Sequence, residues 1–512
     1  MKFKFFSWIG IFLLIFFFTA SVNAATYYVD QNHPNASDEN PGTEELPWKT
    51  INHAAKVVQA GDIVLVKEGE YFESDPVDQT SGMGCESGTI GVYITTSGEP
   101  EKPIIFKAYP GHWVKVRALK RPFVIQHADY IVIDGFIIES QNYDHPSEGA
   151  IWIRGGNKHI TIQNCECIGH YVDVNDNHSA ISLSHGSEDI VIRNCIIHGT
   201  RGGNGSFGIK SYGLRNSIIE NCEIYDCMGG FQLKGNYGPD GHLVESQINK
   251  NVIFSRNIIH DCDWGIHPGS TQNVSYCENI FYNITYGAIG IWAHDEVSVD
   301  VYNNVIYNVG WVLDYGRAGQ DKIPSDLASF FNNIVLKVGD IYDSRFAEAF
   351  SYADYNAFYD YNKFSGNEYP TLQDWKNNTN FDQYSIEADP LFVNAEAHDF
   401  HLRENSPCRN GKDGVNMGAY ITGNEIIGPI LNQGPEVSNE SPARNATDVP
   451  KDTNISFDIT DSDGVDQSSI SVSVNGNNVT QNCTITAISN GFHVLYDPSE
   501  DFDYRQDVTV LV

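Results

Sequence analysis

The sequence predicts an all-β protein whose largest part is a right-handed parallel β-helix, a solenoid of stacked coils. A short unit, usually Asn-Cys or Asn-Asn before apolar residues, recurs at steps of 22 to 35 residues. A fixed strand core with loops of varying length explains such steps. One column of the repeat passes from cysteine to asparagine, through Cys165, Cys195, Cys222, Asn257, Asn279, Asn304 and Asn333.

A second strand lies upstream in each unit and supports the same fold. Apolar residues alternate with other types in segments 150–154, 180–184, 208–212, 230–234, 265–268 and 288–292. This period of two is typical of a strand with one buried face. Turns rich in glycine and asparagine separate the segments, so stacked parallel coils would bury the inward positions in one continuous core.

The Cys-to-Asn column is predicted to point inward. Stacked asparagine amides can hydrogen-bond along a ladder, which satisfies polar groups that are costly to bury. The cysteines of the same column are then small buried apolar residues rather than disulfide partners. Among the ten cysteines, Cys227 and Cys262 are the best candidates for a bridge.

The two ends of the solenoid differ from its middle. Residues 47–58 form an amphipathic pattern, and a helix there would cap the open end. Residues 388–420 are expected to form the closing coils. A linker rich in glycine, asparagine and proline follows at 423–442. Residues 443–512 alternate as half-buried strands around the Asn475-Gly476 turn, which predicts a small β-sandwich that Val512 would leave incomplete.

The first 24 residues have the pattern of a signal peptide. Lys2 and Lys4 precede an apolar run at 9–19, and Val22-Asn23-Ala24 supplies small residues before a cleavage site. A retained membrane anchor is the less favoured alternative, because the run is short for a span. The protein is therefore expected to be secreted or at the cell surface, monomeric, and without a membrane span after cleavage.

The net charge of −34 restricts the partners. A chain this acidic repels nucleic acid and anionic membranes, so neither is expected to bind. An anionic substrate would need a local cluster of basic residues or a bound cation.

Several segments resemble a known family: Thr26-Tyr27-Tyr28-Val29-Asp30, Gly61-Asp62, Gly69-Glu70-Tyr71 and Asp389-Pro390-Leu391-Phe392. Together they are similar to the secreted right-handed parallel β-helix repeat proteins of the pectate-lyase-like superfamily, over about residues 25–422. The resemblance implies a polysaccharide lyase, hydrolase or epimerase. Residues 443–512 resemble a bacterial immunoglobulin-like module, which implies a spacer or adhesion unit.

The strand alternation places candidate site residues on one outward face of the solenoid. A polysaccharide lyase needs a base that removes the proton next to a uronate carboxylate and cations that stabilise the resulting charge. A lysine whose pKa is lowered by cationic neighbours can be that base. The candidate catalytic residues are Lys210, Lys234, His267 and Tyr212. The candidate substrate-binding residues are Arg154, Arg201, Trp152, Trp292 and Gln232.

A turn before one strand is the candidate metal site. Asp173, Asn175 and Asp176 offer oxygen ligands suited to Ca²⁺, although a plain turn rich in Asp and Asn is the favoured reading. No Asn-Thr-Asp with a following Asp-Asp pair is present, so hydrolysis by paired carboxylates is less favoured.

Three functions remain open at this point. The first is a polysaccharide lyase that cleaves an acidic glycan by β-elimination. The second is a non-catalytic glycan-binding or adhesive surface protein. The third is a glycoside hydrolase or an epimerase on the same scaffold.

Overall fold

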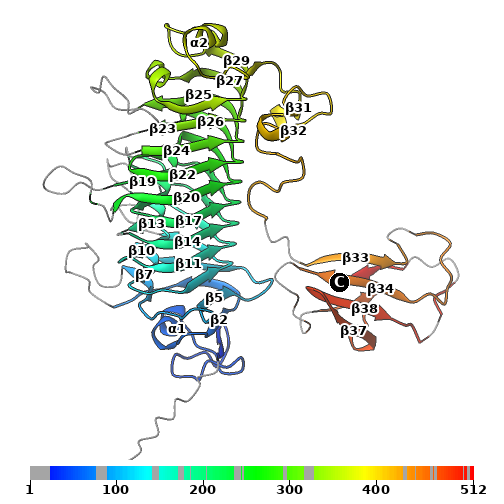
Figure 1. Ribbon diagram of the computed structural model, residues 1–512. Helices are drawn as coiled ribbons and strands as arrows, with labels where there is room; N and C mark the ends of the chain where they lie inside the picture. Colours follow the sequence, from blue (N-terminus) through cyan, green and yellow to red (C-terminus); the bar gives the residue numbers. More distant parts are fainter. Residues whose placement is uncertain are drawn as a thin grey trace, which may run out of the picture.

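The computed structural model confirms the parallel β-helix (Figure 1). It describes residues 24–76, 89–140, 149–170, 178–184, 186–202, 205–235, 244, 247–291, 297–315, 328–430, 435–443, 446–461, 465, 467, 470–499, 501–503 and 508–511. The predicted signal peptide lies outside the described residues, apart from Ala24. Among the described residues, no helix is long and apolar enough to cross a membrane.

One side of the solenoid is a parallel sheet of 12 strands. In spatial order these are β1 Thr26–Val29, β2 Ile63–Val66, β5 Ile104–Ala108, β8 Ile131–Asp134, β11 Lys158–Gln163, β14 Glu188–Arg193, β17 Arg215–Glu220, β20 Asn249–Ser255, β22 Thr271–Cys277, β24 Val297–Tyr302, β26 Ala328–Phe331 and β28 Phe350–Asp354.

The remaining sides form an 18-stranded sheet that turns a corner, and its two halves are described separately. The first half contains β4 Ile90–Ile94, β7 Arg121–Gln126, β10 Ile151–Arg154, β13 Ser179–Ser184, β16 Phe207–Tyr212 and β19 Gly229–Lys234. The second half contains β3 Gly69–Phe72, β6 Val114–Ala118, β9 Ile137–Ser140, β12 Glu166–Ile168, β15 Ile196–His198, β18 Glu223–Tyr225, β29 Ala357–Lys363 and β30 Ile386–Glu387. Long strands join the halves: β21 Ile258–Pro268, β23 Ile280–Ile291, β25 Val305–Tyr315 and β27 Ile334–Tyr342.

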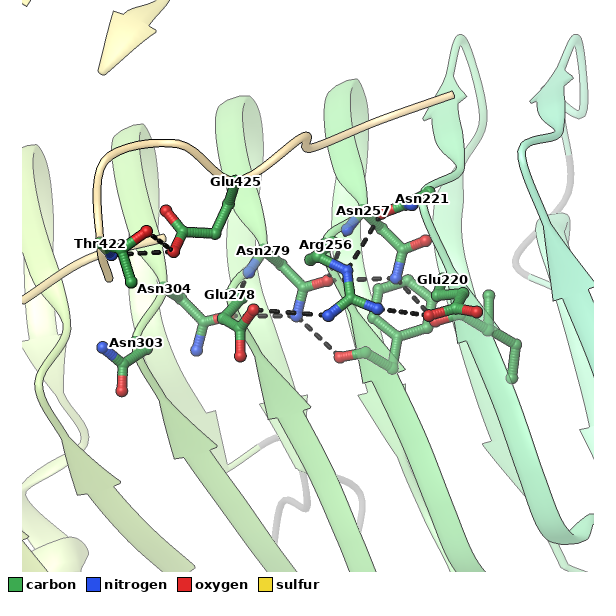
Figure 2. A network of polar contacts seen from close by, with 12 residues as sticks. Glu220, Asn221, Arg256, Asn257, Glu278, Asn279, Asn303, Asn304, Thr422 and Glu425 are labelled. Atoms are coloured by element: carbon green, nitrogen blue, oxygen red, sulfur yellow. Dashed lines mark hydrogen bonds and ion pairs between the residues drawn. The ribbon is translucent and has the colours of Figure 1, made fainter. Parts of the chain in front are cut away.

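The predicted inward column is confirmed, and all of its members are buried. Each asparagine accepts hydrogen bonds from the coil below and donates its amide to the coil above. Asn279 Oδ1 accepts from Asn257 Nδ2 at 3.1 Å, and Asn279 Nδ2 donates to Asn304 Oδ1 at 3.1 Å (Figure 2). The ladder continues through Asn333 to Asn356, one coil beyond the predicted series. The cysteines occupy the same column lower in the solenoid.

The residue before each ladder position explains why asparagine is frequent in the turns. Asn164, Asn194, Asn221, Asn303 and Asn332 all have positive φ. Asparagine tolerates the left-handed region better than most side chains, so it suits a tight corner between two strands. Arg256 and Glu278 take the same conformation at their coils, where Arg256 forms ion pairs with Glu220 and Glu278 (Figure 2).

The predicted N-terminal cap is confirmed as α1 Ile51–Val57. The Thr50 side chain accepts a hydrogen bond from His53 N, as an N-cap does. Glu73, at the end of the first coil, accepts from Ile51 N at 2.8 Å and from Asn52 N at 3.1 Å. A second cap, α2 Leu372–Asn378, covers the other end with the fully buried Trp375. The sequence pattern did not predict α2.

The predicted closing coils at 388–420 are wrong. The parallel coils end at β30, and β31 Phe392–Asn394 and β32 Asp399–Leu402 form an antiparallel pair instead. Apolar residues of this segment pack on the second half of the 18-stranded sheet, in a cluster with Ile280, Val305 and Ile334. The apolar residues of this segment are therefore buried against the outer surface of earlier coils and not inside further coils.

Residues 416–430, here called the strap, then run back along the solenoid toward earlier coils. Gly418 N donates to Asn332 O at 2.7 Å, and Gly428 N donates to Arg256 O at 2.9 Å. Figure 2 shows Thr422 and Glu425 of the strap beside the asparagine ladder. Short 3₁₀ helices accompany these segments: Ser344–Glu348, Ala395–Ala397 and Lys412–Gly414.

The C-terminal part has its own sheets and its own apolar cluster. One sheet contains β33 Glu436–Ser441, β34 Ile455–Thr460, β38 Gly491–Tyr496 and β37 Cys483–Ile488, and the other contains β36 Asn477–Asn478, β35 Ser473–Val474 and β39 Val510–Leu511, with a 3₁₀ helix at Thr480–Asn482. Because β33 pairs with β34, this part begins inside the predicted linker 423–442. Its likeness to an immunoglobulin-like module stays a prediction.

The described cysteines support the interpretation as buried thiols. All nine are free, including Cys227 and Cys262, and only Cys483 is partly exposed. The suggested Cys227–Cys262 bridge is therefore absent, and each of the two thiols donates to the backbone carbonyl two residues before it.

Candidate functional site

The candidate site lies on the outer surface of the first half of the 18-stranded sheet, here called the site face. The strand register stacks Lys210 between Ser182 and Gln232, and Gln232 next to His267. Tyr212 and Lys234 pair in the neighbouring column. The register thus brings five predicted site residues together on adjacent coils, which lie about 4.8 Å apart.

Lys234 has the properties that a base requires. It is half-buried, and burial lowers the pKa of its ammonium group. Its Nζ lies 5.7 Å from the centre of the Tyr212 ring, at cation–π distance. A lowered pKa increases the fraction of neutral amine, which is the form that accepts a proton.

Lys210 differs from the exposed residue that the alternation predicted. Only 1% of it is exposed, and Ser182, one coil below, is fully buried. An ammonium group in such a place adds positive charge beneath the site face without itself meeting solvent. Lys210 is therefore better suited to stabilising a negative charge than to removing a substrate proton.

Trp152 is buried rather than available to stack on a sugar, which corrects that prediction. It is 5% exposed and packs with Ile90 and Val124. Its ring lies between two cations, with the guanidinium carbon of Arg121 at 4.6 Å and that of Arg154 at 4.9 Å. Arg121 was not among the predicted site residues, because it lies at the start of β7, one coil before the first strand of the predicted repeat. This cluster adds two positive charges to the site face.

His267 is also enclosed, at 6% exposure. Its ring lies 5.1 Å from that of Phe207 and 4.8 Å from that of Trp264. Burial lowers the pKa of the imidazole to about 3, so His267 is neutral at physiological pH. The predicted role of His267 as proton donor is not favoured, since a neutral imidazole is a weak acid.

Gln232 lies between Lys210 and His267 in the column, and its Oε1 is buried. Among the described residues this oxygen has no hydrogen-bond partner. A buried acceptor without a partner is costly, so a group outside the described protein atoms, such as a water or a ligand hydroxyl, would satisfy it.

Arg201 does not reach the site face, which corrects its predicted role. It lies in the turn after β15, where its Nε donates to Asp226 Oδ1 at 2.5 Å and its Nη1 lies 3.5 Å from Asp263 Oδ1. Its Nη2 also donates to Asp261 O at 2.6 Å. These contacts pair the guanidinium with two carboxylates and a backbone carbonyl of neighbouring turns.

The remaining predicted residues lie outside the described part of the chain: Trp292, Asp173, Asn175 and Asp176. The suggested Ca²⁺ site therefore stays a prediction. Within the described residues, no group of three or more His, Cys, Asp or Glu side chains is placed to hold a metal ion.

Comparisons with known proteins agree with this architecture. Residues 124–307 match the family described as "Right handed beta helix region". The crystal structure of pectate lyase Pel9A superposes with a TM-score of 0.52 at 14% identity, over 78% of this chain and 97% of that one. The protein is a right-handed parallel β-helix. At this identity the likeness shows the fold alone.

Two further solved structures and one sequence relative are also similar. XylC, solved in complex with xylose, is 13% identical over 88% of this chain and 91% of its own, with a TM-score of 0.43. The PL6 family polysaccharide lyase Pedsa3628 from Pseudopedobacter saltans is 14% identical over 74% and 96%, with a TM-score of 0.41. "Uncharacterized protein YwoF" of Bacillus subtilis (strain 168) is 26% identical over 448 residues, which covers 73% of this chain and 91% of the relative.

Proposed function

We propose that this β-helix protein is a secreted carbohydrate-active enzyme, a polysaccharide lyase that cleaves a uronate-containing glycan by β-elimination. One observation carries the proposal. Lys234, whose pKa is lowered by burial, lies on the site face with Lys210 one coil away and with Arg154 and Arg121 on earlier coils. In a chain with a net charge of −34, four basic residues on one face are a local concentration of positive charge.

The chemistry assigns a role to each group. Neutral Lys234 removes the proton from the sugar carbon next to the carboxylate, and the resulting charge is stabilised by the buried Lys210 ammonium. The bond between the adjacent carbon and the glycosidic oxygen then breaks, which leaves a carbon–carbon double bond. Tyr212, beside Lys234, donates a proton to the leaving oxygen. Arg154 and Arg121 attract the carboxylates of neighbouring sugar units.

The test is product formation by the protein without its predicted signal peptide. Incubation with pectate, alginate and glycosaminoglycans should yield unsaturated products, detected by their ultraviolet absorbance. Both Ca²⁺ and a chelator should be tried, which also tests the predicted metal requirement. Activity should rise with pH and reach its plateau below the ordinary titration range of lysine, because Lys234 must lose its proton.

Substitution of Lys234 makes the test specific. Lys234→Ala should reduce the rate at least about 100-fold, the usual contribution of a general base. Lys234→Arg should be equally inactive, because a guanidinium keeps its proton. The matched control is Lys158→Ala, an exposed lysine of β11 on the 12-stranded sheet. Full activity of Lys234→Ala would contradict the assignment, and products without a double bond would indicate a hydrolase or an epimerase.

A non-catalytic glycan-binding protein is the second candidate. The enclosure of Lys210 and His267 favours it, because enclosed groups do not reach a reacting substrate. Glycan binding that persists in Lys210→Ala and Lys234→Ala, with no product from the unsubstituted protein, would support this candidate.

A further inference from the structure

Large aromatic side chains are exposed on the coils above Lys234. Tyr286 of β23 is 52% exposed and Trp311 of β25 is 37% exposed. Trp264 of β21 is partly exposed. Exposing such rings forgoes the free energy of burying large apolar surfaces, so a group of them on neighbouring coils indicates a binding surface.

Glycines in the adjacent coil fix how these rings lie. In the strand register Gly287 pairs with Trp264 on one side and with Trp311 on the other. A Cβ at Gly287 would lie 3.0 Å from Trp264 Cζ3, and a Cβ at Gly290 would lie 3.2 Å from the same atom. The Trp264 ring therefore packs against the next coil at two glycines, where a Cβ would make a tight contact with it.

The rings form a continuous series that starts at the candidate site. The ring centres of His267 and Trp264 are 4.8 Å apart, and those of Trp264 and Tyr286 are 5.4 Å apart. Trp311 is three coils from Lys234, along β19, β21, β23 and β25. Coils about 4.8 Å apart place Trp311 about 14 Å from Lys234 along the solenoid axis, and its column, that of Gly229, lies five residues from Lys234 across the sheet. This separation is the reach of an oligosaccharide rather than of one sugar.

The charge of the site face changes along the same direction. The coils of Lys210 and Lys234 carry cations, whereas the coil next to Trp311 carries Asp340, in register with Trp311. This carboxylate would repel a uronate. A neutral sugar, whose C–H face is apolar, has no such penalty against an aromatic ring.

We propose that Trp264, Tyr286 and Trp311 form a subsite that stacks on a neutral sugar unit of the glycan whose uronate unit lies at Lys234. The substrate is then a heteropolysaccharide that contains both uronate and neutral sugars. The inference rests on the proposed function for the position of the uronate. It adds the composition of the substrate and the direction in which it extends.

The experiment measures the affinity of full-length protein for two oligosaccharide sets of equal length. One set alternates uronate and neutral units, and the other contains uronate alone. Trp311→Ala and Tyr286→Ala are compared with Tyr359→Ala, a tyrosine of β29 on the second half of the sheet that is 41% exposed. Trp311→Phe keeps a ring, and thermal unfolding checks that every variant is folded.

The expected result is a loss of roughly tenfold or more in affinity for the mixed oligosaccharides in Trp311→Ala and Tyr286→Ala, as for an aromatic residue that dominates an interface. Trp311→Phe should retain most of the affinity, and Tyr359→Ala should match the unsubstituted protein. Turnover of bound substrate should stay unchanged while KM rises.

Two outcomes overturn the subsite. One is unchanged affinity in both alanine variants, and the other is an equal loss for the mixed and the all-uronate sets. Failure of the proposed lyase activity gives a different result. The unsubstituted protein would then form no unsaturated product, while the dependence of binding on Trp311 could still be measured.

Discussion

The inward column of the solenoid contains two kinds of buried residue, cysteine and asparagine. In the lower coils Cys165, Cys195 and Cys222 fill the column, and above them asparagine takes over. The junction is a direct contact, in which Cys222 N donates to Asn257 Oδ1 at 2.9 Å. A buried amide is acceptable only where both its donor and its acceptor are satisfied, and the stacked coils satisfy both.

Asn279→Ala should lower the free energy of unfolding by about 3 kcal/mol or more. The substitution leaves the buried Asn257 N and Phe254 O without their partners, and each unsatisfied group costs about 1–3 kcal/mol. The comparison is Asn251→Gly, at an exposed position of β20 with positive φ, whose amide donates to Asn216 Oδ1. Chemical denaturation should show a far smaller change for Asn251→Gly, and equal losses would refute the role of the inner ladder.

The positions of single residues could be predicted from the sequence where strand alternation determines them. Alternation sets which residues point inward and which share a coil column, so the ladder and the Lys210–Gln232–His267 column were both predicted correctly. It does not determine how far an outward side chain is covered. Trp152, Lys210 and His267 point outward and are nonetheless buried, because neighbouring side chains on the outer face pack over one another.

At the scale of secondary structure elements, the N-terminal cap depends on one buried carboxylate. Glu73 is 3% exposed and binds the first two N–H groups of α1, although burial raises its pKa to about 7. The ordinary value for glutamate is 4.5, so the folded state binds the proton more tightly than the unfolded state. The stability contributed by this proton is fully present below pH 4.5 and is lost as the pH rises through 7.

Glu73→Gln should therefore flatten the dependence of stability on pH. Between pH 5 and 8 the unsubstituted protein is expected to lose stability of the order of 3 kcal/mol through this group, since each unit of pKa corresponds to about 1.4 kcal/mol. Thermal unfolding across this range, with Glu68→Gln as the control in the adjacent exposed turn, measures the difference. Parallel pH profiles for the variant and the unsubstituted protein would count against the raised pKa.

The two caps also show what a local pattern can reveal. The helix at 47–58 was predicted from its apolar periodicity. The second, α2, is short, and only Thr371 and Asp374 mark its start: the Thr371 side chain caps the Asp374 N–H. That pattern could have been noticed, but seven residues give too little periodicity to distinguish a helix from a loop.

At the scale of the whole molecule, contacts between distant segments decide what the repeat pattern does not. The segment after β30 was expected to continue the coils because it retains apolar residues. Instead those residues pack sideways on the second half of the sheet. Phe392, Phe400 and Met417 share one apolar cluster with Ile280, Val305 and Ile334. Most pairs taken across the two groups are more than eighty positions apart in the sequence. Sequence alternation carries no information about such a return path.

Two truncations separate the contributions of the tail and of the C-terminal sheets. A chain of residues 24–430 keeps every member of the apolar cluster that contains Ile280, Val305 and Ile334. It loses only the C-terminal sheets, which have their own apolar cluster. A chain of residues 24–387 also loses Phe392, Phe400, Leu402 and Met417, and exposes Ile280, Val305 and Ile334.

Each large buried side chain contributes about 1.5–3 kcal/mol, so the shorter chain should melt at least about 5 °C below the longer one. The longer chain should unfold at the temperature of the β-helix in the full-length protein. In the full-length protein, calorimetry separates the unfolding of the β-helix from that of the C-terminal sheets, because the sheets would appear as a separate transition. Equal melting temperatures for the two truncated chains would show that the tail is dispensable and that the parallel coils alone stabilise the solenoid.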